Sequence, residues 1–258
     1  MIDLVRRGAG KPLLLIHGLG GHWQSWNPIL DQLSASRELV LFDLPGHGAS
    51  PAESDSGTFA GLVGSVERMI AREGFGAIDI VGSSMGARIA LELARRGGTG
   101  AAVALDPGGF WQGWERAFFK TTIGASVKLL RALRTSLPAI SRNSALRSAL
   151  LAQLSARPWR LDPTLVADEL DSYAGTPTFD ALVRDLGSGP MQQGPAASDS
   201  GPVTIGWGRH DRLCLPRQAG RALAAFPSAR LAWFDRSGHF PHWDEPEAAA
   251  KMILSATA

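Results

Sequence analysis

Short apolar runs alternate with longer stretches of helical length along the first hundred residues. The runs 12–16, 37–42, 77–81 and 101–105 are nearly continuous in apolar residues and are bounded by Gly, Pro or Asp. Continuous rather than alternating hydrophobicity is what a strand covered on both faces requires. The stretches that separate them, 23–33, 58–72 and 85–95, are long enough for helices. This order predicts an α/β fold with a mostly parallel sheet and right-handed crossovers.

The same rhythm returns near the C-terminus but is interrupted in the middle of the chain. Strands are expected at 203–207 and 230–234, and helices at 217–225 and 245–255. Residues 108–198 instead begin with a cluster of aromatic residues, continue with helical stretches and end in a Gly- and Pro-rich segment. The expected helices are 127–136, 144–156, 163–173 and 179–186. We therefore predict a core formed by 1–107 and 199–258, with 108–198 as an inserted helical segment that has a flexible return.

Composition narrows the class of protein. The 258 residues are 45% hydrophobic with a formal net charge of +2, which excludes a disordered chain and gives no argument for nucleic acid. No apolar run approaches the roughly 18 residues of a membrane span, so we expect no integral membrane segment. The N-terminus lacks the pattern of a secretory signal. Cys214 is the only cysteine, which excludes an intrachain disulfide and a cysteine-based metal cluster. We expect a cytoplasmic protein.

The segment Gly82-Ser83-Ser84-Met85-Gly86 carries the strongest chemical signal. It fits the pattern G-x-S-x-G, with Ser84 at the centre, and lies between a predicted strand and a predicted helix. That setting is typical of a nucleophile elbow, in which a strained turn projects the serine above the sheet at a helix N-terminus. Ser83 has the wrong spacing from the glycines for this role.

Together with this elbow, two further segments resemble the α/β-hydrolase superfamily. His17-Gly18-Leu19-Gly20-Gly21 follows an early strand, and Asp43–Ser50 follows the next one. The resemblance implies an α/β-hydrolase fold, with 108–198 as the helical cap. It also implies an oxyanion hole formed by the backbone N–H groups of Leu19 and Met85. His17 is expected to order its loop, and the glycines to let the backbone approach a ligand.

A serine nucleophile needs a base, and the family order is serine, acid, histidine. His210, His239 and His242 follow the elbow. His239 lies in Ser237-Gly238-His239-Phe240-Pro241, which resembles the family's catalytic-histidine loop. Asp211 follows the strand 203–207 and precedes His239 by 28 residues, the usual layout for the acid. Asp106, at the end of the preceding strand, is the alternative acid.

These residues predict a serine hydrolase that cleaves a carboxylic ester through an acyl-enzyme. Trp111 and Phe110 are the candidates for lining the acyl pocket. Serine at the elbow disfavours the dehalogenase and epoxide hydrolase chemistries of the superfamily. No metal-ligand spacing and no phosphate-binding loop is found, so no metal and no cofactor is expected. The alternatives are carbon–carbon bond hydrolysis of the meta-cleavage type, a thioesterase acting on an acyl carrier, and a slow-turnover ligand receptor.

Charge is unevenly distributed within the inserted segment. Residues 111–160 carry nine basic residues and one acid, whereas 161–190 carry six acids and one base. One interpretation is a docking face for an anionic partner on 111–160. The other is that the basic and acidic helices pair with each other.

Overall fold

The computed structural model describes residues 3–258, which form a seven-stranded sheet flanked by helices. The strand order is β1-β3-β2-β4-β5-β6-β7, and every neighbouring pair is parallel except β1 with β3. The strands are β1 (Leu4–Arg7), β2 (Pro12–Ile16), β3 (Glu38–Phe42), β4 (Asp79–Ser83), β5 (Ala102–Leu105), β6 (Val203–Gly208) and β7 (Arg230–Phe234). The predicted α/β-hydrolase fold class, a mostly parallel sheet flanked by helices, is therefore confirmed.

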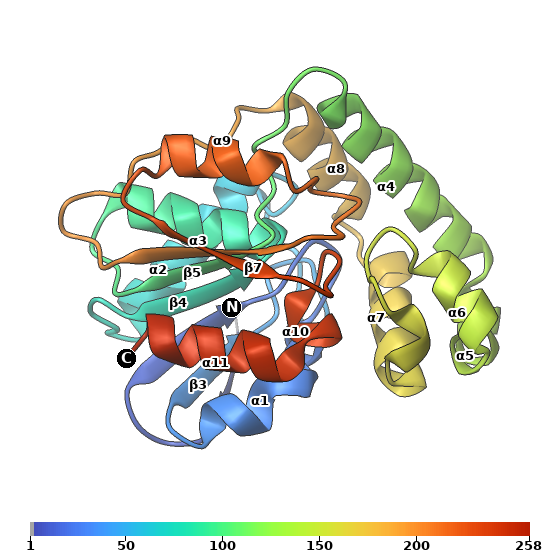
Figure 1. Ribbon diagram of the computed structural model, residues 1–258, viewed down its shortest axis with the longest axis horizontal. Helices are drawn as coiled ribbons and strands as arrows, with labels where there is room; N and C mark the ends of the chain where they lie inside the picture. Colours follow the sequence, from blue (N-terminus) through green and yellow to red (C-terminus); the bar gives the residue numbers. More distant parts are fainter. Residues whose placement is uncertain (1–2) are drawn as a thin grey trace.

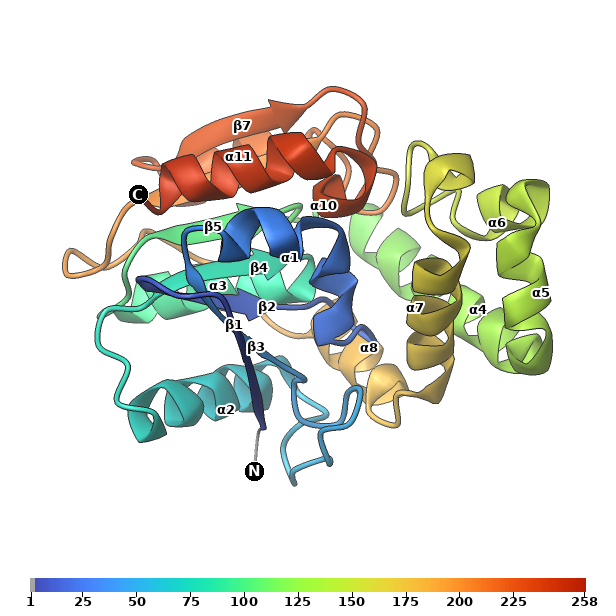
Figure 2. The same ribbon diagram turned by 90° about the horizontal axis from the view of Figure 1, so that it is seen from below.

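Helices cover both faces of this sheet, which explains the continuous hydrophobicity of its strands (Figures 1 and 2). Along β2, Leu13 and Leu15 face one helical layer, whereas Leu14 and Ile16 face the other. The first layer consists of α1 (Asn27–Ser34) and α11 (Pro246–Ala256). The second consists of α2 (Phe59–Arg72), α3 (Met85–Arg96) and α9 (Gln218–Ala225).

The inserted segment forms a group of helices at one end of the molecule (Figure 1). Its helices are α4 (Glu115–Ala132), α5 (Leu137–Arg142), α6 (Ser144–Leu150), α7 (Pro163–Gly175) and α8 (Phe179–Ser188). They share an apolar cluster that includes Leu130, Val166 and Leu170, and Phe240 and Trp243 from the C-terminal region join this cluster. The insertion is therefore packed onto the end of the chain that follows β7.

Several elements differ from the sequence predictions. Strand β1 was not predicted because it is a mostly exposed edge strand with two arginines and no apolar run. The helix expected at 127–136 instead begins at Glu115 and ends at Ala132, so it includes part of the aromatic cluster. The helix expected at 144–156 ends at Leu150, and the short helix α10 (Pro241–Asp244) was not predicted.

The return from the insertion to the core is irregular but anchored by backbone hydrogen bonds. Gln192 N–H donates to Gly109 O at 3.0 Å, and Ala197 N–H donates to Ala94 O at 2.9 Å. The first bond connects the return to the segment after β5, and the second connects it to α3.

Two ion pairs join the basic and acidic halves of the insertion. Arg131 lies 2.7 Å from Asp180, and Arg134 lies 2.7 Å from Asp171. These contacts correspond to the internal pairing interpretation of the charge pattern. Among residues 3–258, no helix has both the length and the apolar character needed to cross a membrane.

Candidate active site

The turn between β4 and α3 places Ser84 in a strained backbone conformation. Its φ is 56° and its ψ is −114°, a region that non-glycine residues rarely adopt. The two glycines of the motif make the turn possible. A Cβ on Gly82 would lie 2.1 Å from Gly86 O, and a Cβ on Gly86 would lie 2.2 Å from Ile16 O. Strand, turn and helix therefore pack too closely for a side chain at position 82 or 86, and the turn presents Ser84 between them.

A chain of hydrogen bonds connects Ser84, His239 and Asp211. Ser84 Oγ lies 2.8 Å from His239 Nε2, and His239 Nδ1 lies 2.8 Å from Asp211 Oδ2. His239 and Asp211 are both buried. With the carboxylate accepting from Nδ1–H, Nε2 is the nitrogen left to accept the serine proton. The structure thus brings together the three residues that the sequence singled out.

The turn after β6 fixes the Asp211 carboxylate. Its Oδ1 accepts from the backbone N–H groups of Leu213 at 2.8 Å and Cys214 at 3.0 Å. Trp207, at the end of β6, donates from Nε1 to Cys214 O at 2.8 Å. These bonds leave Oδ2 directed at the histidine.

Asp106, the alternative acid, contacts Asp211 rather than His239. It lies just beyond β5 with a positive φ of 46°, is fully buried and accepts from Gly208 N–H at 2.8 Å. Burial raises the pKa of Asp106 well above its usual range, and the charge of Asp211, with which it shares a hydrogen bond, raises it further. The surroundings of Asp106 therefore favour its neutral form.

The loop that carries His239 is bonded to the insertion. His239 N–H donates to Leu154 O at 2.8 Å. Asp244 in α10 accepts from Gly238 N–H at 2.7 Å and from Ala156 N–H at 2.8 Å, which ties the loop to the segment after α6. The sequence analysis did not single out Asp244. Its only signal was its place five residues after His239.

The loop after β2 approaches the serine on the other side. A Cβ on Gly18 would lie 3.2 Å from Ser84 Cβ. The next residue, Leu19, lines the same cavity as Ser84, Met85 and His239. Met85 is the first residue of α3, so its N–H has no intrahelical acceptor. Both predicted oxyanion-hole residues therefore border the reacting end of the cavity.

His17 fixes the start of this loop through two hydrogen bonds. Leu44 N–H donates to His17 Nε2 at 3.0 Å, and His17 Nδ1 lies 2.8 Å from Gly18 O. Since Nε2 accepts, Nδ1 carries the proton and donates to the carbonyl. Burial lowers the pKa of His17 to about 3, so the ring is neutral and keeps this tautomer at neutral pH.

Two other buried histidines give a prediction for acid stability. Burial lowers the pKa of His47 and of His242 from 6.5 to about 3. Below pH 6.5 the unfolded chain therefore binds protons that the folded protein does not, and stability falls as the pH decreases towards 3. From pH 7 to 5, the free energy of unfolding should fall by about 2 kcal/mol more in the wild type than in His47→Gln. Urea unfolding of both proteins at the two pH values measures this difference, and equal losses would contradict it.

Ser84 and His239 open onto an apolar cavity of about 280 Å³ between the core and the insertion. Its walls include Trp111, Phe119 and Leu130, and the Trp111 and Phe119 rings stack with their centroids 4.7 Å apart. Trp111 thus lies where the sequence analysis expected it. Phe110 does not: it packs in the core with residues of α3 and α9 and does not line the cavity.

One cationic side chain lies in the cavity wall. Arg88, one helical turn after Ser84, is buried, and this burial lowers its pKa to about 10, so it remains charged at neutral pH. Its Nη2 donates to Pro190 O at 2.6 Å, and its guanidinium stacks on Phe59 at 4.1 Å from the ring centroid. Arg88 therefore connects the wall of the cavity to the return segment.

The site offers one group of possible metal ligands among the described residues. Ligand atoms of Asp211, Cys214 and His239 lie within 4.8 Å of one another. Burial, followed by the charge of Asp211, raises the pKa of the Cys214 thiol well above its usual value. Because cysteine binds metals as the thiolate, this donor set does not favour an ion.

A serine in a strand–helix turn, a His–Asp pair at the ends of later strands and a helical insertion together define an α/β-hydrolase. Sequence comparison agrees: the alpha/beta hydrolase family matches residues 13–252, and the chain belongs to this family.

Several characterised proteins are similar over most of the chain. The dihydrolipoyllysine-residue acetyltransferase component of the acetoin cleaving system of Cupriavidus necator is 30% identical, over 95% of this chain and 63% of that protein. The chain thus spans less than two thirds of that relative. A 2-hydroxy-6-oxononadienedioate/2-hydroxy-6-oxononatrienedioate hydrolase of Cupriavidus pinatubonensis is 27% identical, over 96% of this chain and 87% of that protein. The pimeloyl-[acyl-carrier protein] methyl ester esterase of Methylococcus capsulatus is 29% identical, over 95% of this chain and 94% of that protein.

Proposed function

We propose that the protein is a serine hydrolase that cleaves a carboxylic ester with an apolar acyl group. The observation that carries this proposal is the Ser84–His239–Asp211 hydrogen-bond chain at the reacting end of an apolar cavity. No cofactor is part of the reaction.

The proposed mechanism begins with attack of Ser84 Oγ on the ester carbonyl carbon while His239 Nε2 takes the serine proton. Asp211 holds the ring and stabilises the imidazolium that forms. The tetrahedral oxyanion accepts hydrogen bonds from the N–H groups of Leu19 and Met85. The C–O bond to the alcohol breaks as His239 returns its proton to the leaving oxygen. Water, activated by the same histidine, then attacks the acyl-enzyme and releases the acid.

The cavity limits the size of the acyl group. Its volume of about 280 Å³ is larger than the roughly 150 Å³ of an engineered apolar cavity that holds benzene. An aryl or a short to medium alkyl acyl group would therefore fill it. Trp111 and Phe119 supply apolar contact surface in the wall.

A series of p-nitrophenyl esters of increasing acyl length tests this proposal. Because each buried methylene is worth about 0.8 kcal/mol, kcat/KM should rise about fourfold per carbon until the cavity is full, and then level off or fall. Enlarging the cavity wall by Leu130→Ala should move the maximum to a longer chain, whereas Leu146→Ala, at a half-exposed leucine of α6 that does not line the cavity, should not. A flat profile in all three proteins would contradict an acyl role for the cavity.

A second candidate reaction is hydrolysis of a carbon–carbon bond in a vinylogous diketone. The similarity to the dienedioate hydrolase of Cupriavidus pinatubonensis favours it, and so does the charged Arg88 in the cavity wall. Turnover of a 2-hydroxy-6-oxo-dienoate, measured as the loss of its visible absorbance, separates this reaction from ester hydrolysis. Thioester cleavage on an acyl carrier is tested in the same way with an acyl-thioester. A slow-turnover receptor predicts ligand binding with no appreciable turnover of any of these substrates.

The cellular setting is also a proposal. A cytoplasmic location fits the single, buried cysteine. Docking of an anionic partner on 111–160 stays a prediction, and the ion pairs of Arg131 and Arg134 occupy two of the basic side chains it would use.

A further inference from the structure

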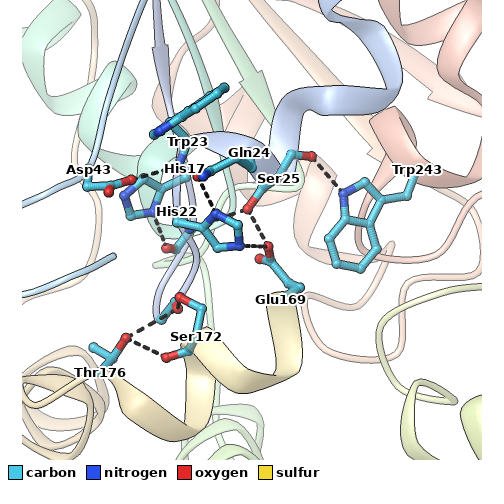
Figure 3. Close-up of polar contacts among 12 residues, drawn as sticks. His17, His22, Trp23, Gln24, Ser25, Asp43, Glu169, Ser172, Thr176 and Trp243 are labelled. Atoms are coloured by element: carbon cyan, nitrogen blue, oxygen red, sulfur yellow. Dashed lines mark hydrogen bonds and ion pairs between the residues drawn. The ribbon is translucent and has the colours of Figure 1, made fainter. Parts of the chain in front are cut away.

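A buried carboxylate on α7 contacts the loop that carries Leu19 (Figure 3). Glu169 is 2% exposed and accepts a hydrogen bond from Ser25 Oγ at 2.6 Å. His22 Nε2 lies 3.3 Å from the same carboxylate oxygen. Ser25 and His22 both belong to the stretch that leads from Leu19 into the next helix. The insertion therefore reaches into the loop with a buried acidic side chain.

Ser172 on α7 and Thr176, the residue that follows this helix, also bond the loop. Ser172 Oγ donates to Gly20 O at 2.7 Å, and Thr176 Oγ1 lies 3.3 Å from the same oxygen. Glu169 and Ser172 are three residues apart, which places them on one face of α7. Gly20 immediately follows Leu19, so these bonds hold the carbonyl next to the proposed oxyanion donor.

Two glycines of the loop lie where a side chain would clash with the insertion. A Cβ on Gly20, whose φ is 76°, would lie 2.5 Å from the ring of Phe179. A Cβ on Gly21 would lie 2.9 Å from Glu169 Oε1. The sequence analysis attributed these glycines to the approach of a ligand. In the structure they allow the close approach of α7 and α8.

The core bonds the loop at its start and along its last residues. Leu44 N–H donates to His17 at the start. Near the end, Trp23 N–H donates to Asp43 Oδ1 at 2.8 Å, and Trp243 Nε1 donates to Ser25 O at 2.9 Å (Figure 3). Gly20 O, which lies between these anchors, and the side chains of His22 and Ser25 have their contacts with α7. A buried carboxylate is costly unless it is hydrogen-bonded, and an apolar residue would pack α7 against the core at lower cost. The contacts of Glu169 with the loop account for an acidic residue at this position.

We propose that Glu169 is a positioning residue that, with Ser172, holds the loop so that the Leu19 N–H points into the oxyanion hole. This inference rests on the proposed function, because it concerns the same reaction. According to this proposal, the insertion does more than form the wall of the cavity. It also sets the geometry of one of the two groups that stabilise the transition state.

Glu169→Gln tests the proposal, with Asp168→Asn as the matched control. The control makes the same acid-to-amide change at the neighbouring, exposed residue. For both variants, kcat for a p-nitrophenyl ester is measured and divided by the number of active sites that react with a phosphonate. This titration counts only folded and competent molecules. Glu169→Gln should lower kcat by about 10- to 100-fold with little change in KM, because a displaced oxyanion donor acts mainly on the transition state. Asp168→Asn should leave both constants unchanged.

Hydrogen exchange provides a readout that does not depend on catalysis. Backbone amides of residues 18–25 should exchange faster in Glu169→Gln than in the wild type or in Asp168→Asn. If Glu169→Gln does not accumulate as folded protein, Ser172→Ala is measured in the same way and should also lower kcat per site.

The outcomes separate the two proposals. Unchanged kcat per reactive site in Glu169→Gln overturns the positioning role, as does a fall only in the number of reactive sites, which indicates a purely structural residue. If Ser84→Ala keeps wild-type turnover, the proposed function itself fails, whatever Glu169→Gln does.

Discussion

Replacement of Ser84 by alanine is expected to lower kcat for a p-nitrophenyl ester by about 10⁶, because the group that attacks the carbonyl is lost. The variant should still bind the substrate, since the cavity and the backbone N–H groups of Leu19 and Met85 remain. A residual rate of about 10³–10⁴ over the uncatalysed reaction is expected from those groups alone.

Ser83→Ala is the matched control for this experiment. Ser83 is the neighbouring hydroxyl, is buried, and its Oγ has no hydrogen-bond partner among the described residues. Its loss should leave kcat nearly unchanged. Mass spectrometry after reaction with a phosphonate should show labelling of the wild type and of Ser83→Ala, but not of Ser84→Ala. Turnover of Ser84→Ala within a few-fold of the wild type would remove Ser84 from the mechanism.

The second large effect is expected at the pair of buried carboxyl groups. Asp211→Asn should lower kcat by about 10⁴, because an amide in contact with Nδ1 favours the tautomer that places the proton on Nε2, where the serine proton must go. Asp106→Asn should lower kcat by less than about tenfold, since an amide can make the same hydrogen bonds as a neutral carboxyl group.

Asp106→Asn also decides between the two candidate acids. In the structure, His239 Nδ1 contacts Asp211, and burial raises the pKa of Asp106, which favours its neutral form. Steady-state kinetics of both variants, with active sites counted by a phosphonate, measure the two effects. If the larger loss fell on Asp106→Asn, Asp106 would be the working acid and the proposed assignment would be wrong.

Local sequence signals were sufficient where neighbouring residues determine the structure. The glycines around Ser84 predicted the elbow, because the turn itself excludes side chains at 82 and 86. The apolar runs predicted six of the seven strands. Strands β2 to β6 are almost fully buried, and β7 is partly buried. The edge strand β1 was not predicted because it is mostly exposed and needs no apolar run.

Contacts between distant segments could not be predicted in this way. Glu169 looked like one of several acids in 161–190, although its neighbour Asp168 is exposed and Glu169 is buried. Only the packing of α7 against the loop after β2 distinguishes them. Phe110 and Trp111 are adjacent in sequence, yet one packs in the core and the other lines the cavity. Aromatic character alone does not determine which of the two side chains lines the cavity.

The bonds that complete the site also bear on how the protein folds. Ser25 and Glu169 are 144 residues apart, Gly20 and Ser172 are 152 apart, and Ser84 and His239 are 155 apart. The parallel strands β2, β3 and β4 come from the first third of the chain and can pair without the rest. Closing the longer loops costs additional chain entropy, and contacts of large sequence separation form slowly. A nascent or refolding chain would thus acquire most of its sheet before Ser84 contacts His239 and the loop after β2 has its support. An incomplete molecule then lacks the hydrogen-bond chain on which the proposed hydrolysis depends.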